Sequence, residues 1–166
     1  MNLEFAVFVS RASQGSRIGA LAIIAPVPLL STIVVLGGQQ STVSQYLLLL
    51  SVVVVTVGLS GMIWWAASFM LVSETKVIVG FAPLSWVQIG VGEISSVTIV
   101  DVDPYAQYGG WGIKGSKKSE LGRLFSAGGS RAVRVCTADG RTYLVGFRYQ
   151  SSESETARDM ILKRIG

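Results

Sequence analysis

The sequence predicts an α+β membrane protein, in which two apolar helices near the N-terminus are followed by a β-rich domain closed by one helix. Half of the 166 residues are hydrophobic and only 14% are charged, whereas about 25% of the residues in a typical soluble domain are charged. The apolar surplus lies in two blocks without any charged residue, 18–38 and 47–72. Residues 73–166 instead contain short runs that alternate apolar and polar side chains, as β-strands do.

The first apolar block is long enough to cross a bilayer. At a rise of ~1.5 Å per residue, residues 18–38 form a helix of roughly 31 Å, which matches a hydrocarbon core of about 30 Å. The block is longer than the apolar region of a signal peptide, and no cleavage pattern follows it. Pro26 and Pro28 lie near its middle, where each removes a backbone donor and kinks the helix. We therefore expect a retained, kinked span, and a moving hinge is the alternative interpretation of the kink.

The second apolar block is longer than a bilayer requires. Residues 47–72 correspond to a helix of roughly 39 Å, so we expect it to tilt or to leave the membrane at one end. Trp64 and Trp65 lie toward its C-terminal end, and tryptophan is favoured at the membrane–water interface. We predict that these two side chains lie at the interface and that residues 66–72 emerge at the level of the headgroups.

The basic residues predict the topology. Arg11 and Arg17 precede the first span, the connection between the spans carries no charge, and twelve Lys and Arg follow the second span. The positive-inside rule then places both termini in the cytoplasm of a multi-pass protein of the inner (plasma) membrane. We expect residues 1–17 to be a cytosolic N-terminal segment. The single Cys136 would lie in a reducing compartment, where a structural disulfide is not expected.

Residues 73–166 are expected to form one cytosolic β domain. Its clearest element is a hairpin over residues 131–147, in which Asp139 and Gly140 supply the positive backbone φ angles that a tight turn needs. Apolar residues at helical spacing then predict a C-terminal helix over residues 152–165. Ser152 and Glu155 have the spacing of a capping box at its start.

The order of these elements resembles a family of bacterial membrane proteins. The motifs are "GGWGIK" at 109–114, "RAVRV" at 131–135 and "DGRTYLVG" at 139–146. With the helical hairpin and the closing helix, they resemble two-span, largely actinobacterial proteins that have a C-terminal pleckstrin-homology-like (PH-like) domain and mostly no assigned activity. The resemblance implies an antiparallel β-roll of seven strands in two sheets, capped by the C-terminal helix. It implies no catalytic residues.

The residue types needed for catalysis are scarce. The chain has no histidine and one cysteine, and it lacks a phosphate-binding loop, a nucleophile elbow and a zinc-binding motif, so we expect no enzyme, no metal site and no cofactor. Asp101 and Asp103 share one face of a strand and could hold a cation. A turn before Pro104 is the favoured interpretation of the two acids.

A segment rich in aromatic and basic residues is the candidate binding site. Residues 114–150 contain eight Lys and Arg against two acidic residues, a net charge of +6, and residues 73–113 have a net charge of −3. Glycines at 109 and 110 fit a structural turn, whereas exposed Trp, Tyr and Lys fit an edge that contacts lipid or a partner protein. The candidate binding residues are Tyr105, Tyr108, Trp111, Lys114, Lys117, Lys118 and Arg123.

These patterns lead to a functional hypothesis. We expect a non-enzymatic, membrane-anchored binding or scaffolding module, whose cytosolic PH-like domain engages a protein partner or the anionic inner leaflet. Membrane lipids and another membrane or cytosolic protein are the expected partners. Self-association is left open, and no nucleic-acid-binding motif is present. The alternative is a small oligomeric transport or channel subunit, in which the helix kinked at Pro26 and Pro28 moves.

Overall fold

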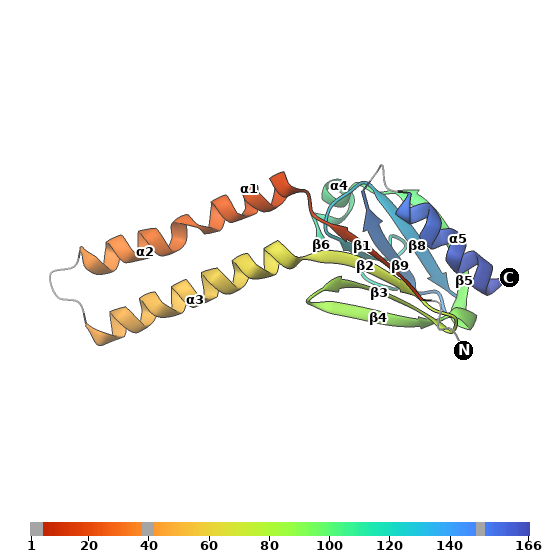
Figure 1. The fold of residues 1–166 in the computed structure, drawn as a ribbon, viewed down its shortest axis with the longest axis horizontal. Helices are drawn as coiled ribbons and strands as arrows, with labels where there is room; N and C mark the ends of the chain where they lie inside the picture. Colours follow the sequence, from red (N-terminus) through yellow and green to blue (C-terminus); the bar gives the residue numbers. More distant parts are fainter. Residues whose placement is uncertain (1–4, 38–41, 149–151) are drawn as a thin grey trace. The chain divides into compact units, whose positions relative to one another are not determined.

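The computed structural model describes residues 5–37, 42–148 and 152–166 and separates into two compact units. The helical unit comprises Ser13–Trp65, and the β unit comprises the residues up to Ala12 together with Ala66–Gly166. Figure 1 traces the elements of both units in sequence order.

The helical unit contains three helices, of which the first two follow one another almost directly. They are α1 (Gln14–Ile24), α2 (Pro26–Leu36) and α3 (Val43–Trp65), and α1 and α2 both pack along α3. Two stretches, Gln14–Val35 and Val43–Trp65, are long and apolar enough to cross a membrane. The two apolar helices that the sequence predicts are therefore present.

The two prolines lie where a helix tolerates them. Both fall in the first turn of α2, where the backbone N–H groups have no partner inside the helix. The N–H of Ala25 still donates to the carbonyl of Leu21 at 2.8 Å, so the chain passes from α1 to α2 with one residue between them. This arrangement fits a structural bend at Ala25.

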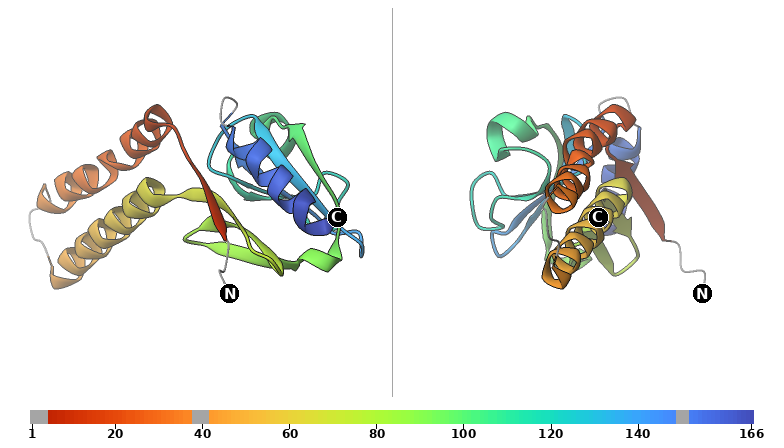
Figure 2. Two further views of the ribbon diagram at one scale, coloured as in Figure 1. Left: turned by 45° about the vertical axis from the view of Figure 1, so that its right-hand side comes forward. Right: turned by 90° about the vertical axis from the view of Figure 1, so that its left-hand side faces the viewer.

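The β unit is built from two sheets that face each other. The first sheet is antiparallel with the order β1-β2-β3-β4, and the second has the order β5-β8-β9-β7-β6 with one parallel pair, β7 and β9. Figure 2 shows these strands and the C-terminal helix from two further directions. The strands of the first sheet are β1 (Ala6–Arg11), β2 (Ala67–Val72), β3 (Lys76–Ala82) and β4 (Ser85–Gly90). Those of the second are β5 (Ile94–Asp101), β6 (Gly112–Lys114), β7 (Arg123–Ser126), β8 (Arg131–Thr137) and β9 (Thr142–Phe147).

The core fills the space between the sheets and is closed by α5 (Glu153–Ile165). Met70 and Val79 from the first sheet and Val133 and Val145 from the second are fully buried. The helix α5 packs on both sheets and adds its own buried side chains to this core. A short 3-10 turn, η1 (Val91–Glu93), connects the sheets, and a short helix, α4 (Pro104–Tyr108), follows β5.

Three local predictions have different outcomes. The hairpin over 131–147 is confirmed, because β8 and β9 pair from Arg131↔Phe147 to Cys136↔Thr142. Only Gly140 has a positive φ, +80°, in its turn, so the expected positive φ at Asp139 is wrong. The capping box is also wrong, because the side chain of Ser152 makes no capping hydrogen bond to α5.

The boundaries of the β unit differ most from the sequence-based expectation. β1 and β2 pair at six positions, from Ala6↔Val72 to Arg11↔Ala67. Residues 6–11 therefore belong to a sheet and are not a separate segment, and residues 67–72 form a strand and are not the end of an apolar helix. The domain predicted to start at residue 73 lacked two strands. The physical reason is that β2 reads ASFMLV, an apolar run that composition cannot distinguish from a continuing helix.

The strand inventory also differs from the expected roll. The described residues form nine strands in sheets of four and five, with one parallel pair, where the resemblance implied seven antiparallel strands. Two facing sheets with a C-terminal helix agree with the general arrangement that the resemblance implied.

The pairing of β1 with β2 predicts how the β unit can be separated from the helices. If residues 13–65 are replaced by Asn-Gly, the two strands become an ordinary hairpin, because a two-residue turn is the commonest closure of antiparallel strands. We expect this hairpin-closed variant to unfold cooperatively in urea, as followed by circular dichroism. The fragment 73–166 should lack a cooperative transition, because it exposes the core face that β1 and β2 cover. Equal cooperativity of the two proteins would contradict the assignment of β1 and β2 to the domain.

Candidate binding surface

The candidate segment begins at α4, whose first turn is held by an acid. The Asp103 carboxylate accepts hydrogen bonds from the N–H groups of Tyr105 (2.9 Å) and Ala106 (3.0 Å). Asp103 is therefore the N-cap of α4, which agrees with the favoured turn interpretation of the two acids. Within 5–37, 42–148 and 152–166, no group of three His, Cys, Asp or Glu side chains is placed to hold a metal ion.

Tyr108 attaches the segment to the outer side of the five-stranded sheet. Its half-buried ring packs against a small apolar cluster that includes Leu124 and Leu144. Its hydroxyl donates to the Leu121 carbonyl at 2.5 Å. Burial raises the pKa of the Tyr108 hydroxyl, and the positive charge of Arg134 opposes this shift. Tyr108 thus has a structural role at this site.

Tyr105 and Trp111 form an aromatic pair. The Trp111 Nε1–H donates to the Tyr105 hydroxyl, and the Trp111 ring packs against the edge of the main core. Gly109 and Gly110 adopt φ angles of +72° and +121°, which reverse the chain between α4 and the tryptophan. Tyr105 stays 64% exposed, so it is the aromatic side chain of this pair that a ligand could reach.

Lys114 of the segment lies on β6, Lys117 and Lys118 lie on the loop after it, and Arg123 begins β7. The loop is tight, because Gly115 has a φ of +73° and a Cβ there would come within 2.4 Å of the Gly122 carbonyl. The Thr142 N–H also donates to the Lys117 carbonyl at 2.8 Å. In the part of the chain that the structure describes, no ion pair joins Lys114, Lys117 or Lys118 to an acidic side chain.

The predicted binding residues do not form one patch. Lys114 pairs with Leu124 on the outer side of the sheet. Arg123 precedes Leu124 in β7 and pairs with Tyr143 of the core, so strand alternation places it on the opposite face. A basic residue that the sequence analysis did not single out, Arg134, shares the outer side, and its Nη2 donates to the Glu120 carbonyl at 3.2 Å. Its alternation with the core residues Val133 and Val135 is the signal that could have identified it.

The tryptophans predicted at the membrane interface lie in the last turn of α3. Trp64 is 47% exposed and Trp65 is 72% exposed. The Arg17 guanidinium lies 5.9 Å from the centroid of the Trp64 ring, within the range of a cation–π interaction. The start of α1 and the end of α3 therefore lie close together, and the prediction that the two tryptophans lie at a membrane interface stays a prediction.

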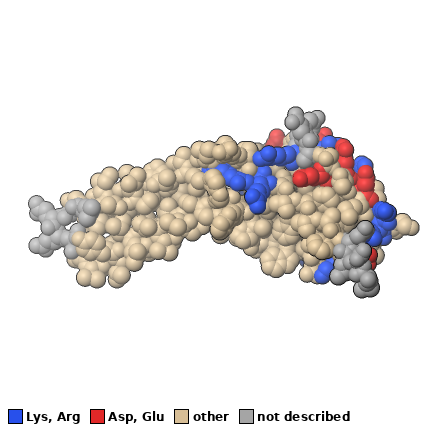
Figure 3. Space-filling view, viewed as in Figure 1, with Lys and Arg blue, Asp and Glu red and all other residues tan. Residues whose placement is uncertain are grey.

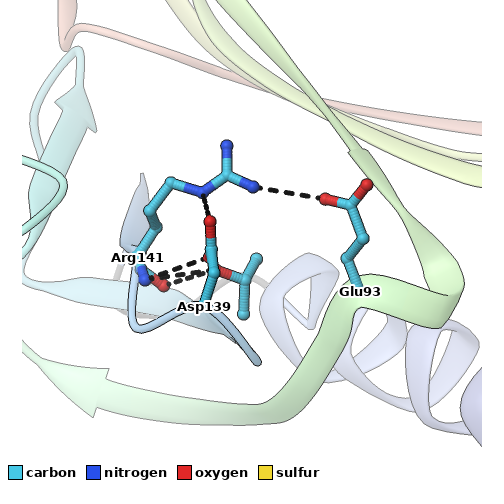
Figure 4. A network of polar contacts seen from close by, with 4 residues as sticks. Glu93, Asp139 and Arg141 are labelled. Carbon is cyan, nitrogen blue, oxygen red and sulfur yellow. Dashed lines mark hydrogen bonds and ion pairs between the residues drawn. The ribbon is translucent and has the colours of Figure 1, made fainter.

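A polar network lies at the turn between β8 and β9 (Figure 4). Arg141 contacts Asp139 at 2.5 Å and Glu93 at 3.3 Å. The Thr137 hydroxyl donates to the other oxygen of Asp139. The hydrogen bond from Arg141, followed by that from Thr137, lowers the pKa of Asp139 from 3.8 to about 2. The network joins the β8–β9 turn to η1.

The lowered pKa predicts a pH-dependent contribution of Asp139 to stability. A carboxylate with a depressed folded-state pKa stabilises the fold above its unfolded pKa and loses this effect as the pH falls through the folded value. Asp139→Asn should therefore lower the urea midpoint between pH 5 and 7, and the difference from wild type should shrink between about pH 4 and pH 2. Thr137→Val removes a hydrogen-bond donor to Asp139 and should raise the folded-state pKa of this carboxyl group. The pH range in which Asp139 loses its stabilising effect should therefore begin at a higher pH. A difference that does not change with pH would contradict the arrangement.

The Tyr108 hydroxyl predicts a local effect on the loop. Tyr108→Phe removes the donor to the Leu121 carbonyl and should cost about 1 kcal/mol of unfolding free energy. Amide hydrogen exchange should accelerate around residues 119–122 and stay unchanged in β8. Tyr105→Phe is the matched control, because its hydroxyl accepts from Trp111 and does not reach the loop.

No family model and no curated protein matches this chain. The resemblance to PH-like membrane proteins stays a prediction carried by the motifs at 109–114, 131–135 and 139–146.

Proposed function

We propose that this chain is a non-enzymatic binding module, held at the inner membrane by its two apolar helices and presenting a basic surface to anionic groups. The observation that carries the proposal is the pairing of β1 with β2. These neighbouring strands flank the helices in the sequence, so the helical pair is an insertion between two adjacent strands of the β unit.

The pairing constrains the topology of the proposed anchor. If the helices cross a bilayer, both connections to the β unit must lie on the same side, because β1 and β2 share a continuous ladder. The positive-inside rule makes that side the cytoplasm, since Arg11, Arg17 and the twelve later basic residues all lie there. In this proposal, sheet pairing places both connections on one side of the membrane, and the charge distribution alone assigns that side to the cytoplasm.

The connections between the units are short enough to keep the β unit at the membrane surface. Only Ala12 and Ser13 separate β1 from α1, and only Ala66 separates α3 from β2. A basic side chain held near an anionic leaflet contributes about 1 kcal/mol to association. Lys114, Lys117 and Lys118 suit this role, because no ion pair in the described residues neutralises them. An acidic surface of a membrane protein would be recognised by the same chemistry.

We also propose that the β unit is a PH-like roll extended by β1 and β2. The support is two facing sheets closed by a C-terminal helix. Binding in this proposal rests on the basic residues and not on the fold, because one fold serves many functions.

The transport alternative has less support from the helical unit. A groove of about 360 Å³ between the helices is lined mainly by Val, Ile and Leu side chains. Its two hydroxyls, on Ser51 and Thr56, donate to carbonyls of their own helix. Transport sites in membrane helices usually rely on ionisable groups or free polar groups, and the described lining residues supply neither.

The proposed contact with lipid predicts that charge reversal in the basic loop weakens binding to anionic vesicles, and that this effect depends on salt. In the hairpin-closed variant, Lys114→Glu, Lys117→Glu and Lys118→Glu together should abolish co-sedimentation with phosphatidylglycerol vesicles at low salt. A matched control replaces Arg158, Lys163 and Arg164 of α5 by Glu, which changes the net charge equally. Equal losses in the two variants would show that net charge alone governs binding. Retained binding by the loop variant would contradict the proposal for lipid.

A further inference from the structure

The two ends of the four-stranded sheet differ in charge. One end, called the connection end below, is where β1 stops and β2 starts, at the pair Arg11↔Ala67. The β3–β4 turn lies at this same end, because Ala67 is also the register partner of Ala82 in β3 (Figure 1). The β2–β3 turn lies at the other end, where the charged residues Glu74 and Lys76 are exposed. Of these two turns, only the β3–β4 turn lies beside the strand ends that lead into the helices.

The β3–β4 turn is apolar and exposed. Residues 82–86 read APLSW, and the side chains of Leu84 and Trp86 are 54% and 60% exposed. The Leu84 N–H donates to the Phe81 carbonyl at 2.9 Å, which closes the turn. The space-filling view shows only uncharged atoms over the region of this turn (Figure 3). Exposed apolar side chains that lie together mark an interaction site.

The backbone that carries these two side chains is well supported. β3 and β4 pair at six positions, from Lys76↔Gly90 to Phe81↔Ser85. At the base of the turn, a Cβ on Gly80 would lie 2.6 Å from the Ser85 carbonyl oxygen, so the two strands approach each other closely there. The turn therefore presents its apolar side chains from a closely packed hairpin.

We propose that the β3–β4 turn contacts the bilayer, with Leu84 at the boundary of the acyl chains and the Trp86 ring among the headgroups. This inference rests on the membrane anchoring proposed above and gives the β unit a contact of its own with the same leaflet. The bilayer is the occupant that the chain connection favours. Only Ala66 separates α3 from β2, and Ala67, the next residue, lies in register with Ala82 at the turn.

The distances along the sheet fit this contact. Neighbouring strands lie about 5 Å apart, so the start of the turn lies close to the residue at which the chain leaves α3. The row that contains Gly80 and Trp86 lies two residues from the row of Ala67 and Ala82, or about 7 Å along the strands. The headgroup layer of one leaflet is roughly 5–8 Å thick. Leu84 and Trp86 can therefore lie in this layer together.

The chemistry of the connection end suits a phospholipid interface. Tryptophan is favoured at this level because its ring is apolar and its N–H can still donate a hydrogen bond. Leucine adds apolar area that lipid chains can cover. Arg11 is exposed at the same end, and a guanidinium group binds phosphate through two hydrogen bonds. Glu74 at the other end of the sheet has the opposite preference, because an anionic leaflet repels a carboxylate.

Quenching by spin-labelled lipid tests the contact in the full-length chain. With Cys136→Ser as background, Leu84→Cys and Thr75→Cys carry the same fluorophore in separate proteins, reconstituted into vesicles of phosphatidylcholine and phosphatidylglycerol. Nitroxides on the headgroup or high on the acyl chain should quench the probe at Leu84→Cys strongly. The probe at Thr75→Cys, an exposed site in the β2–β3 turn, should stay unquenched. Equal quenching at the two sites, or none at Leu84→Cys, would overturn the proposal.

A charge beside the probe should remove the contact. Trp86→Glu, added to the Leu84→Cys chain, should lower the quenching to the level of the Thr75→Cys control, because a carboxylate avoids an anionic leaflet. Leu162→Glu makes the same charge change at an exposed apolar site of α5 and should leave the quenching unchanged. Trp86→Phe keeps an aromatic ring and should lose less quenching than Trp86→Glu. Equal effects of Trp86→Glu and Leu162→Glu would show that net charge governs the signal and would contradict a contact at the turn.

A third probe separates the turn contact from the anchor. Val54 lies in the middle of α3 and is 62% exposed, so a fluorophore at Val54→Cys should be quenched by nitroxides deep in the acyl chains. Quenching at Val54→Cys without quenching at Leu84→Cys would overturn the turn contact and leave the anchor standing. An unquenched Val54→Cys would overturn the anchor, and the inference that rests on it would fail as well.

Discussion

The pairing between β1 and β2 is the constraint on which the other features of this chain depend. The two strands are joined by a hydrogen-bonded ladder of six residue pairs although the whole helical unit lies between them in the sequence. Closing so long a loop costs conformational entropy before any contact is gained. The paired helices reduce this cost, because the start of α1 and the end of α3 already lie close enough for Arg17 to contact Trp64. The helical hairpin thus acts as a structured connection that brings the two strands together.

The same strands connect the helical unit to the interior of the β unit. Ser68 of β2 is fully buried, and its hydroxyl lies 2.8 Å from the Gly146 carbonyl of β9 and 3.3 Å from the Ser10 carbonyl of β1. A buried hydroxyl with such acceptors links three strands from both sheets. This polar contact lies one residue from Ala67, close to the end of α3.

The sequence was informative where one physical signal dominated. Long uncharged runs predicted the apolar helices, strict alternation around Gly140 predicted the β8–β9 hairpin, and helical spacing predicted α5. Prediction failed where two structures share one composition: β2 is apolar on both faces, so it continued the apolar run of α3 without a visible boundary. The prediction of the candidate binding site was wrong for a different reason. Its residues are close in sequence, but strand alternation separates Arg123 from Lys114, and only the register of the hairpin adds Arg134.

The apolar character that concealed β2 in the sequence is also a functional clue. A contiguous apolar face of a sheet often marks an interaction site, and the described residues of the β unit cover the inner face of β2. Lys114, with its neighbour Leu124, lies on the outer side of the five-stranded sheet, whereas the uncovered apolar face belongs to the four-stranded sheet. Because the two sheets face each other across the core, these surfaces lie on opposite sides of the β unit.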